Sequence, residues 1–376
     1  MAHRLLCILR VVRPKVENDH QMSHRGGEPD AARRGRFALR PWQIPWQGWK
    51  DVLWRVGDEL ENDDVLDVAA SVAFYALLAL FPALIATISL YGIVANPDDI
   101  VRQMHRLTLA IPANARSLIA QQMGEIAASS MAELRLSLLA SLGVALFSAS
   151  GGVAALMRGI NKAYDETETR GWLRIRLLAL SFTLGLAAFV VFSVAVITLL
   201  PPLMKHVGLE ASARSLIEVC RWPVLAAATM LGLGILYRYA PNRTPAKWQW
   251  VSPGAVLATL IWTLASLSFS LYAANFGRFN KTYGTLGGAV VLGLWLFLSA
   301  LAILLGAELN SELEQQTEKD STIGPSRPMG ERGAAAADQL GKQRPSPEPM
   351  SFRASLRERL RALNRPRRTK SRLSNR

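Results

Sequence analysis

The stretch that decides the fold is TYGTLGGAVVLGLWLFLSALAILLGAELN, Thr282–Asn310. After its opening turn it is apolar for more than 20 residues, and its first charged side chain is Glu308. A helix of about 20 apolar residues crosses the hydrocarbon core of a bilayer. In lipid every backbone N–H and C=O must be satisfied within the element, which favours a helix. This stretch therefore predicts a transmembrane helix.

Five other stretches have the same length and character. A soluble helical protein is disfavoured, because its core helices rarely run this long without a charged face. Half of the residues are hydrophobic, and the net charge of +14 includes a basic surplus in the C-terminal region. The fold class that we predict is all-α: a polytopic membrane protein with six transmembrane helices plus short amphipathic helices. The expected spans are 66–95, 136–158, 177–200, 217–238, 251–275 and 284–308.

Three regions follow from this pattern. We expect a disordered N-terminal tail over 1–45, a six-helix membrane domain over 46–312, and a disordered basic C-terminal tail over 313–376. That tail contains a short basic amphipathic helix starting at Phe352, which is suited to anionic lipid or to non-specific contact with nucleic acid. The tryptophan-rich segment 46–62 is expected to be a helix. It either lies on the membrane surface or packs its tryptophans onto the ends of other helices.

Basic residues predict the orientation. Cytoplasmic loops of membrane proteins are enriched in Lys and Arg close to the helix ends. One set of connections is short and carries eight such residues; the other carries eight as well, four of them in the long loop 96–135. The short-loop set, together with both tails, indicates cytoplasmic termini. The short-loop residues are Arg158, Lys162, Arg170, Arg174, Arg176, Arg238, Arg243 and Lys247.

The sequence lacks the motifs of soluble enzyme sites. It contains no CxxC, HExxH, Walker-type glycine loop or GxSxG pattern. Its two cysteines, Cys7 and Cys220, are expected on opposite sides of the membrane, so no disulfide is predicted. We expect no catalytic residue, no cofactor, no metal site and no specific nucleic-acid partner. The partners that we expect are the lipid bilayer and, for the chain itself, a second copy in a homo-oligomer.

Five blocks of sequence carry a family resemblance, in this order: AASVAFYALLALFP (Ala69–Pro82), SASGGVAALMRGINKAYD (Ser148–Asp165), LYRYAPNR (Leu236–Arg243), SPGAVLATLIW (Ser252–Trp262) and the stretch Thr282–Asn310. Together they resemble the YihY/BrkB family of bacterial inner-membrane proteins, over about 46–312. The resemblance implies the bacterial inner membrane and no established mechanism. The family's old label, ribonuclease BN for tRNA processing, was judged a misassignment.

Three functions remain open at this stage. The first is transport or export of a small solute, the second is a structural or envelope-integrity role without transport, and the least favoured is a tRNA-processing ribonuclease. Hydrolytic nucleases need metal-binding carboxylates or histidines, or an acid–base pair, converging on phosphate. Here most acids outside the tails are predicted at membrane edges. The sequence therefore favours a protein that is not an enzyme.

Candidate positions for function or packing lie within the spans. Pro82 is either a hinge or a tolerated kink, and the small residues around Gly152 form either a close helix contact or a substrate path. Glu308 is expected to pair with Arg158, Arg176 or Arg238, as a gate or as a fixed brace between helices. The full candidate set is Ser71, Tyr75, Pro82, Ser148, Gly152, Arg158, Arg238, Asn275, Tyr283, Gly284 and Glu308.

Overall fold

The structure is a computed structural model that describes residues 28–94, 130–206, 211–276 and 280–344. Over these ranges the chain is helical, with one isolated antiparallel bridge between Ala246 and Thr322. The elements are α2 (Glu28–Arg33), a 3-10 turn η1 (Pro41–Gln43), α3 (Trp46–Asn62), α4 (Val65–Val94), α7 (Met131–Ala163), α8 (Trp172–His206), α9 (Ala211–Tyr239), α10 (Trp248–Phe276), α11 (Asn280–Glu314) and α12 (Ala335–Asp338).

Six of these helices, α4 and α7 to α11, are long and apolar enough to cross a membrane. Each coincides with one of the six predicted spans. The all-α, polytopic membrane fold is therefore confirmed. Local sequence sets some of the boundaries: Ser130 and Glu133 form a reciprocal capping box at the start of α7. Pro82 lies inside α4, which continues through it to Val94.

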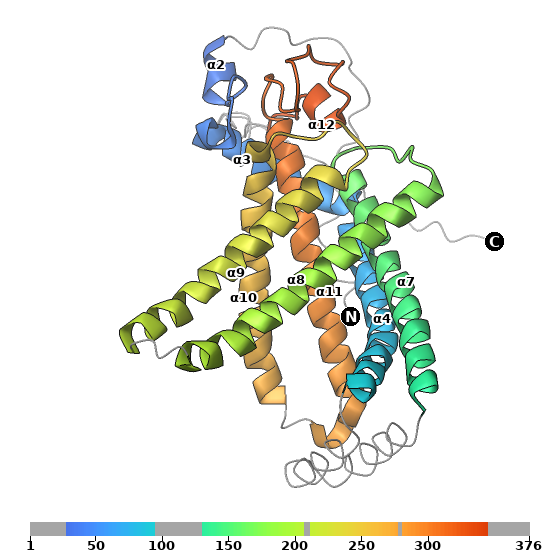
Figure 1. Cartoon of the computed structure of the whole chain (residues 1–376). Helices are drawn as coiled ribbons and strands as arrows, with labels where there is room; N and C mark the ends of the chain where they lie inside the picture. Colours follow the sequence, from blue (N-terminus) through green and yellow to red (C-terminus); the bar gives the residue numbers. More distant parts are fainter. Residues whose placement is uncertain (1–27, 95–129, 207–210, 277–279, 345–376) are drawn as a thin grey trace, which may run out of the picture.

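The six helices are not packed equally. α4 packs along α7, and α10 packs along α11. α11 also contacts α3, α4 and α7, so it is the central helix of the bundle. α8 and α9 slant away from the other four as a pair (Figure 1). Few residues of the α8 and α9 spans are buried, which suits a surface in contact with lipid.

Small residues allow the closest helix contacts. On α7, Gly151 and Gly152 lie against the side chain of Tyr75 on α4. A Cβ atom on Gly254 of α10 would lie 2.0 Å from the carbonyl oxygen of Gly306 on α11. Such backbone approach between helices is typical of membrane proteins, where van der Waals packing drives association. These glycines therefore fix the spacing of the α4–α7 and α10–α11 pairs.

One end of the bundle is built from polar segments. We call it the polar end, and it comprises α3, the loops 164–171 and 240–247, and the segment 315–344. Thr244 N donates to the Gly333 oxygen at 2.9 Å, and Lys247 N donates to the Ser321 oxygen at 2.8 Å. The guanidinium of Arg332 is buried and donates to the carbonyl oxygens of Ala337 and Glu318.

The ordered part of this segment differs from the expected disordered C-terminal tail over 313–376. Residues 315–344 are folded onto the polar end, because their backbone groups bond to the 240–247 loop and because Ala334, Ala336 and Ala337 are buried. The expected N-terminal tail over 1–45 differs too, since Arg36 donates to the oxygens of Gln315 and Gly341. The loop 96–129 and the basic helix expected from Phe352 lie outside the described residues.

The expected helix over 46–62 is α3. One face packs against α11, where Val52 is fully buried, and Trp49 joins the same core. Trp42 and Trp46 are exposed on the other side. The packing of Trp49 agrees with tryptophans that pack onto another helix, and the position of α3 on the membrane surface stays a prediction.

We predict that Gly254→Ala destabilises the protein, because the new Cβ has to push α10 away from α11. We expect a loss of about 3 kcal/mol, the upper part of the range for an overpacked core. The measurement is thermal unfolding in detergent. The matched control is Gly232→Ala in α9, where a Cβ meets nothing within 4 Å. There the better helix propensity of alanine leaves stability unchanged or raised. Equal stability of the two variants would contradict the close contact.

Candidate functional site

The last turns of α11 gather the polar residues of the bundle. Glu308, Asn310, Glu312, Glu314 and Gln316 are all buried, although they follow an apolar span. A buried polar group is costly unless it is hydrogen-bonded, and a buried charge is more costly unless it is paired. Each of these side chains is therefore expected to have a partner from another element, and most of them do.

Two buried ion pairs hold this end of α11. Arg55 of α3 pairs with Glu312 and also donates to Gln316 Oε1 at 2.9 Å. Arg243, in the 240–247 loop, pairs with Glu314 at 2.7 Å, and both side chains are almost fully buried. Glu314 also accepts from the Ser321 hydroxyl at 2.5 Å. These bonds connect α11 to α3, to the 240–247 loop and to the segment that follows α11.

An amide completes the contact between α10 and α11. Asn310 Oδ1 accepts from Gly254 N at 2.7 Å, and Asn310 Nδ2 donates to the Val251 oxygen at 3.1 Å. Both the donor and the acceptor of the amide are thus used inside the bundle. Tyr237 of α9 adds a bond to the same region by donating to the Ile303 oxygen at 2.7 Å.

Glu308 has a different kind of partner. Its carboxyl group lies beside that of Asp63, the residue between α3 and α4, and the two acids interact electrostatically. A hydrogen bond between two carboxyl groups requires a proton on one of them, because an ionised carboxylate is an acceptor only. The Oε1 atom of Glu308 is buried and has no hydrogen-bond partner within the described part of the chain. Glu308 and Asp63 are thus two neighbouring acids that could share a proton, and we call them the carboxyl pair.

The surroundings of the carboxyl pair carry further acids and one lysine. Burial raises the pKa of Asp63 to about 6. The bond to Glu308 and the charge of Lys162 oppose this rise in pKa, while Asp165 and Glu59 add to it. Lys162 itself pairs with Asp64 at 2.9 Å, at the exposed rim. Among the described residues, no group of three or more His, Cys, Asp or Glu side chains is arranged to hold a metal ion.

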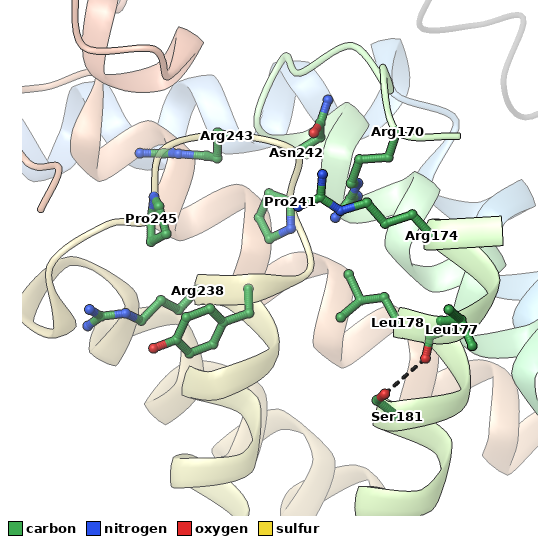
Figure 2. A pocket seen from close by; sticks show the side chains of 11 residues that line it. Arg170, Arg174, Leu177, Leu178, Ser181, Arg238, Pro241, Asn242, Arg243 and Pro245 are labelled. Carbon is green, nitrogen blue, oxygen red and sulfur yellow. Dashed lines mark hydrogen bonds between the residues drawn. The ribbon is translucent and has the colours of Figure 1, made fainter. Parts of the chain in front are cut away.

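A hollow of about 440 Å³ opens beside this region, between the start of α8 and the end of α9. Figure 2 shows Arg170 and Arg174 reaching from the α8 side toward Pro241 and Asn242, with Leu178 and Ser181 further along α8. The remaining lining residues are Leu177, Arg238, Tyr239, Arg243 and Pro245. Each wall therefore carries two arginines, and Leu177 and Leu178 add an apolar part to the α8 wall.

The predicted candidates fall into three groups. Ser71, Tyr75 and Pro82 lie on α4, and Ser148 and Gly152 lie on α7. Of these, Tyr75 and Gly152 meet directly. The contact favours packing over a substrate path for the small residues of α7. The last group, in α10 or α11 with side chains that fall outside the described part, is Asn275, Tyr283 and Gly284.

The expected pairing of Glu308 with an arginine is corrected by the structure. Arg158 is exposed, and Arg176 donates to the Phe147 oxygen at 2.8 Å while its guanidinium covers the Phe147 ring. Arg238 lies over the Trp248 ring. Within the described residues none of these arginines forms an ion pair with Glu308, and Asp63 lies beside Glu308 instead.

The sequence pattern did not single out Asp63, Arg55, Arg243 or Asn310 as site residues. A signal for the α11 residues was present, since Glu308 and Glu312, and likewise Asn310 and Glu314, are four residues apart. Residues at this spacing share a helix face. Two polar stripes at the end of an apolar helix indicate that two different partners approach it.

Comparison with known proteins agrees with this architecture. The family model described as Virulence factor BrkB matches residues 56–330. The chain belongs to the BrkB family. The match includes the carboxyl pair, the Arg243–Glu314 ion pair and the start of the ordered segment after α11, up to residue 330, and it begins one residue after Arg55.

Relatives in this family cover most of the chain. A Bacillus subtilis protein named ribonuclease-like protein YfkH is 33% identical over 257 residues, which is 66% of this chain and 90% of that protein. A UPF0761 membrane protein of Idiomarina loihiensis is 23% identical over 280 residues, 73% of this chain and 95% of its own length. No solved structure matches the chain.

The raised pKa of Asp63 predicts a pH dependence of stability. A carboxyl group whose pKa is higher in the folded state stabilises the fold when it is protonated, and this contribution is lost as pH rises through about 6. We therefore expect the melting temperature of the parent in detergent to be a few degrees higher at pH 5 than at pH 7.5. In Asp63→Asn this difference between the two pH values should be smaller. The control is Asp67→Asn, at an exposed position of α4. A parent and an Asp63→Asn variant with the same pH profile would contradict the assignment.

Proposed function

We propose that this BrkB-family membrane protein transports or exports a small solute, and that the carboxyl pair makes the process respond to protons. The observation that carries the proposal is the juxtaposition of Asp63 with Glu308, an acid that is buried at the end of the sixth span. Ionisable groups at membrane depth are costly, and they mark proton relays and substrate paths in transporters.

The position of the pair supports a role in movement. Asp63 lies in the two-residue connection between α3 and α4, and the following residue, Asp64, has a positive φ of 48°. Glu308 lies on α11, the helix that contacts both α3 and α4. Loss of the shared proton places two negative charges side by side, which repel strongly at short distance in a low-dielectric site. Proton binding therefore biases how α11 sits against the α3–α4 connection.

We further propose that the polar end faces the cytoplasm of a bacterial inner membrane. The short loops at this end are rich in Lys and Arg, including Lys162, Arg170 and Arg243. Positive residues near helix ends remain preferentially on the cytoplasmic side. The Idiomarina loihiensis relative is a membrane protein by its name, and both relatives named above are bacterial. These names favour a bacterial membrane as the location of this chain.

A structural role without transport is the second candidate. It is favoured by the two buried ion pairs, Arg55–Glu312 and Arg243–Glu314, which tie α11 to three other elements. Breaking one side of such a pair strands the other charge, so these contacts resist opening. A fixed bundle is the arrangement that an envelope-integrity protein needs.

Ribonuclease activity is not carried over from the name of the Bacillus subtilis relative. Glu312 and Glu314 are engaged by arginines, and the carboxyl groups of Glu308 and Asp63 lie against each other. Such acids are not arranged as free ligands for a catalytic metal or as an exposed acid–base pair on a phosphate.

Flux into liposomes tests the transport proposal. The protein is reconstituted with an imposed pH gradient and screened against a panel of small organic and inorganic solutes. We expect the parent to move at least one solute with a rate that depends on the gradient, and Glu308→Gln or Asp63→Asn to lose that dependence. Asp67→Asn serves as the control that keeps it. If no solute moves, or if the carboxyl variants behave like the parent, the structural role becomes the better description.

Reporter fusions test the orientation. Fusions near residue 168 and after residue 310 should give the cytoplasmic signal, because both positions lie at the polar end. A fusion near residue 115 should give the signal of the opposite side. A cytoplasmic signal near residue 115 would reverse the orientation without affecting the fold.

A further inference from the structure

The hollow between α8 and α9 has an excess of positive charge. Two of its arginines are already neutralised: Arg170 pairs with Glu168 at 2.6 Å, and Arg243 pairs with Glu314. The other two, Arg174 and Arg238, form no ion pair within the described ranges. The hollow therefore presents two uncompensated positive charges, one from each of its flanking helices.

Arg238 is held in place without using all of its donors. Its guanidinium lies over the Trp248 ring at 4.9 Å and near the Tyr239 ring at 5.5 Å. Its Nε atom is buried and has no hydrogen-bond partner among the residues that the structure describes. A buried donor without a partner is costly, and a bound acceptor relieves this cost. Arg174 of α8 is exposed on the opposite wall.

Aromatic residues place the hollow at the membrane surface. Trp172 begins α8, Tyr239 ends α9 and Trp248 begins α10, and all three are exposed. Trp and Tyr concentrate at the level of the lipid headgroups, where one part of the ring is dry and the other is wet. Tyr239 and Arg238 line the hollow itself. Its arginines therefore lie at headgroup depth.

The α8 wall becomes apolar beyond its arginines, toward the hydrocarbon. Leu177, which is exposed, and Leu178 line the hollow, and the rest of the α8 span beyond them is apolar and little buried. A ligand that filled this hollow would have an anionic group beside an apolar chain. The volume of about 440 Å³ is large enough for a headgroup and the first part of such a chain.

We propose that this hollow binds the headgroup of an anionic phospholipid. The phosphate accepts hydrogen bonds from Arg174 and is attracted by the charge of Arg238 on the α9 side, and the start of the acyl chain lies along Leu177 and Leu178. The N-terminus of α8 adds a favourable partial positive charge for the phosphate. A free phosphate ion would use the same arginines but not the leucine wall, which is why a lipid suits the hollow better. This site is independent of transport and of the carboxyl pair.

Lipid titration in detergent tests the proposal. The purified full chain is stripped of lipid and titrated with phosphatidylglycerol or with phosphatidylcholine of identical acyl chains. Retained lipid is measured by native mass spectrometry, and the melting temperature is recorded in parallel. We expect phosphatidylglycerol to bind at least tenfold more tightly than phosphatidylcholine. The preference should fall to near one in Arg174→Gln/Arg238→Gln and remain in Arg158→Gln, an exposed arginine of α7 outside the hollow.

Two further experiments separate lipid binding from a folding defect and from binding of free phosphate. Because Arg238 stacks on Trp248, its replacement can disturb folding, so Arg174→Gln alone is compared with Arg174→Lys, which keeps the charge at an exposed position. The first should weaken the preference and the second should retain part of it. Inorganic phosphate in millimolar excess should not displace phosphatidylglycerol. Equal binding of the two lipids, an unchanged preference in the arginine variants, or displacement by inorganic phosphate would each overturn the lipid site.

Discussion

The polar end depends on one constraint, the burial of the last turns of α11. After its apolar part, α11 ends in a row of buried carboxylate and amide side chains. Each of these side chains needs a hydrogen-bond or ion-pair partner from another element. Those partners come from the N-terminal helix α3, from the 240–247 loop and from the first turn of α10. The arrangement of the polar end therefore follows from pairing the polar side chains at the end of α11. The segment 315–344 folds over the same end.

The sequence blocks that carry the family resemblance are the places where these elements meet. Tyr75 of the first block packs on Gly152 of the second. The Asn161 side chain of the second accepts from Asn242 N of the third at 2.8 Å. Gly254 of the fourth donates to Asn310 of the last at 2.7 Å. Residues that are far apart in the sequence are thus tied to one another by contacts that tolerate few other side chains.

The six spans could be predicted from the sequence because their signal is local: a run of apolar residues of membrane length needs no knowledge of its neighbours. The candidate site could be predicted only in part. Glu308 stands out as an acid inside an apolar run, but its partner Asp63 follows an amphipathic helix in a string of polar residues, where nothing distinguishes it. Charge alone suggested an arginine. Tertiary packing decides which face of each helix points inward. In this fold it places a second acid, Asp63, beside Glu308. The segment 315–344 was missed for a related reason, since its Pro, Gly and Ala content is typical of disorder and its partners lie elsewhere in the chain.

The buried ion pairs also impose an order on biogenesis. Arg55 precedes the first span and Arg243 lies between the fourth and the fifth, whereas both of their partners, Glu312 and Glu314, are at the end of the sixth. During synthesis from the N-terminus, five spans are made while these two arginines have no acid to neutralise them. A nascent chain that stops before α11 is complete carries two stranded cations at the membrane surface. The bundle is therefore complete, in charge as well as in packing, only when the last helix has been added.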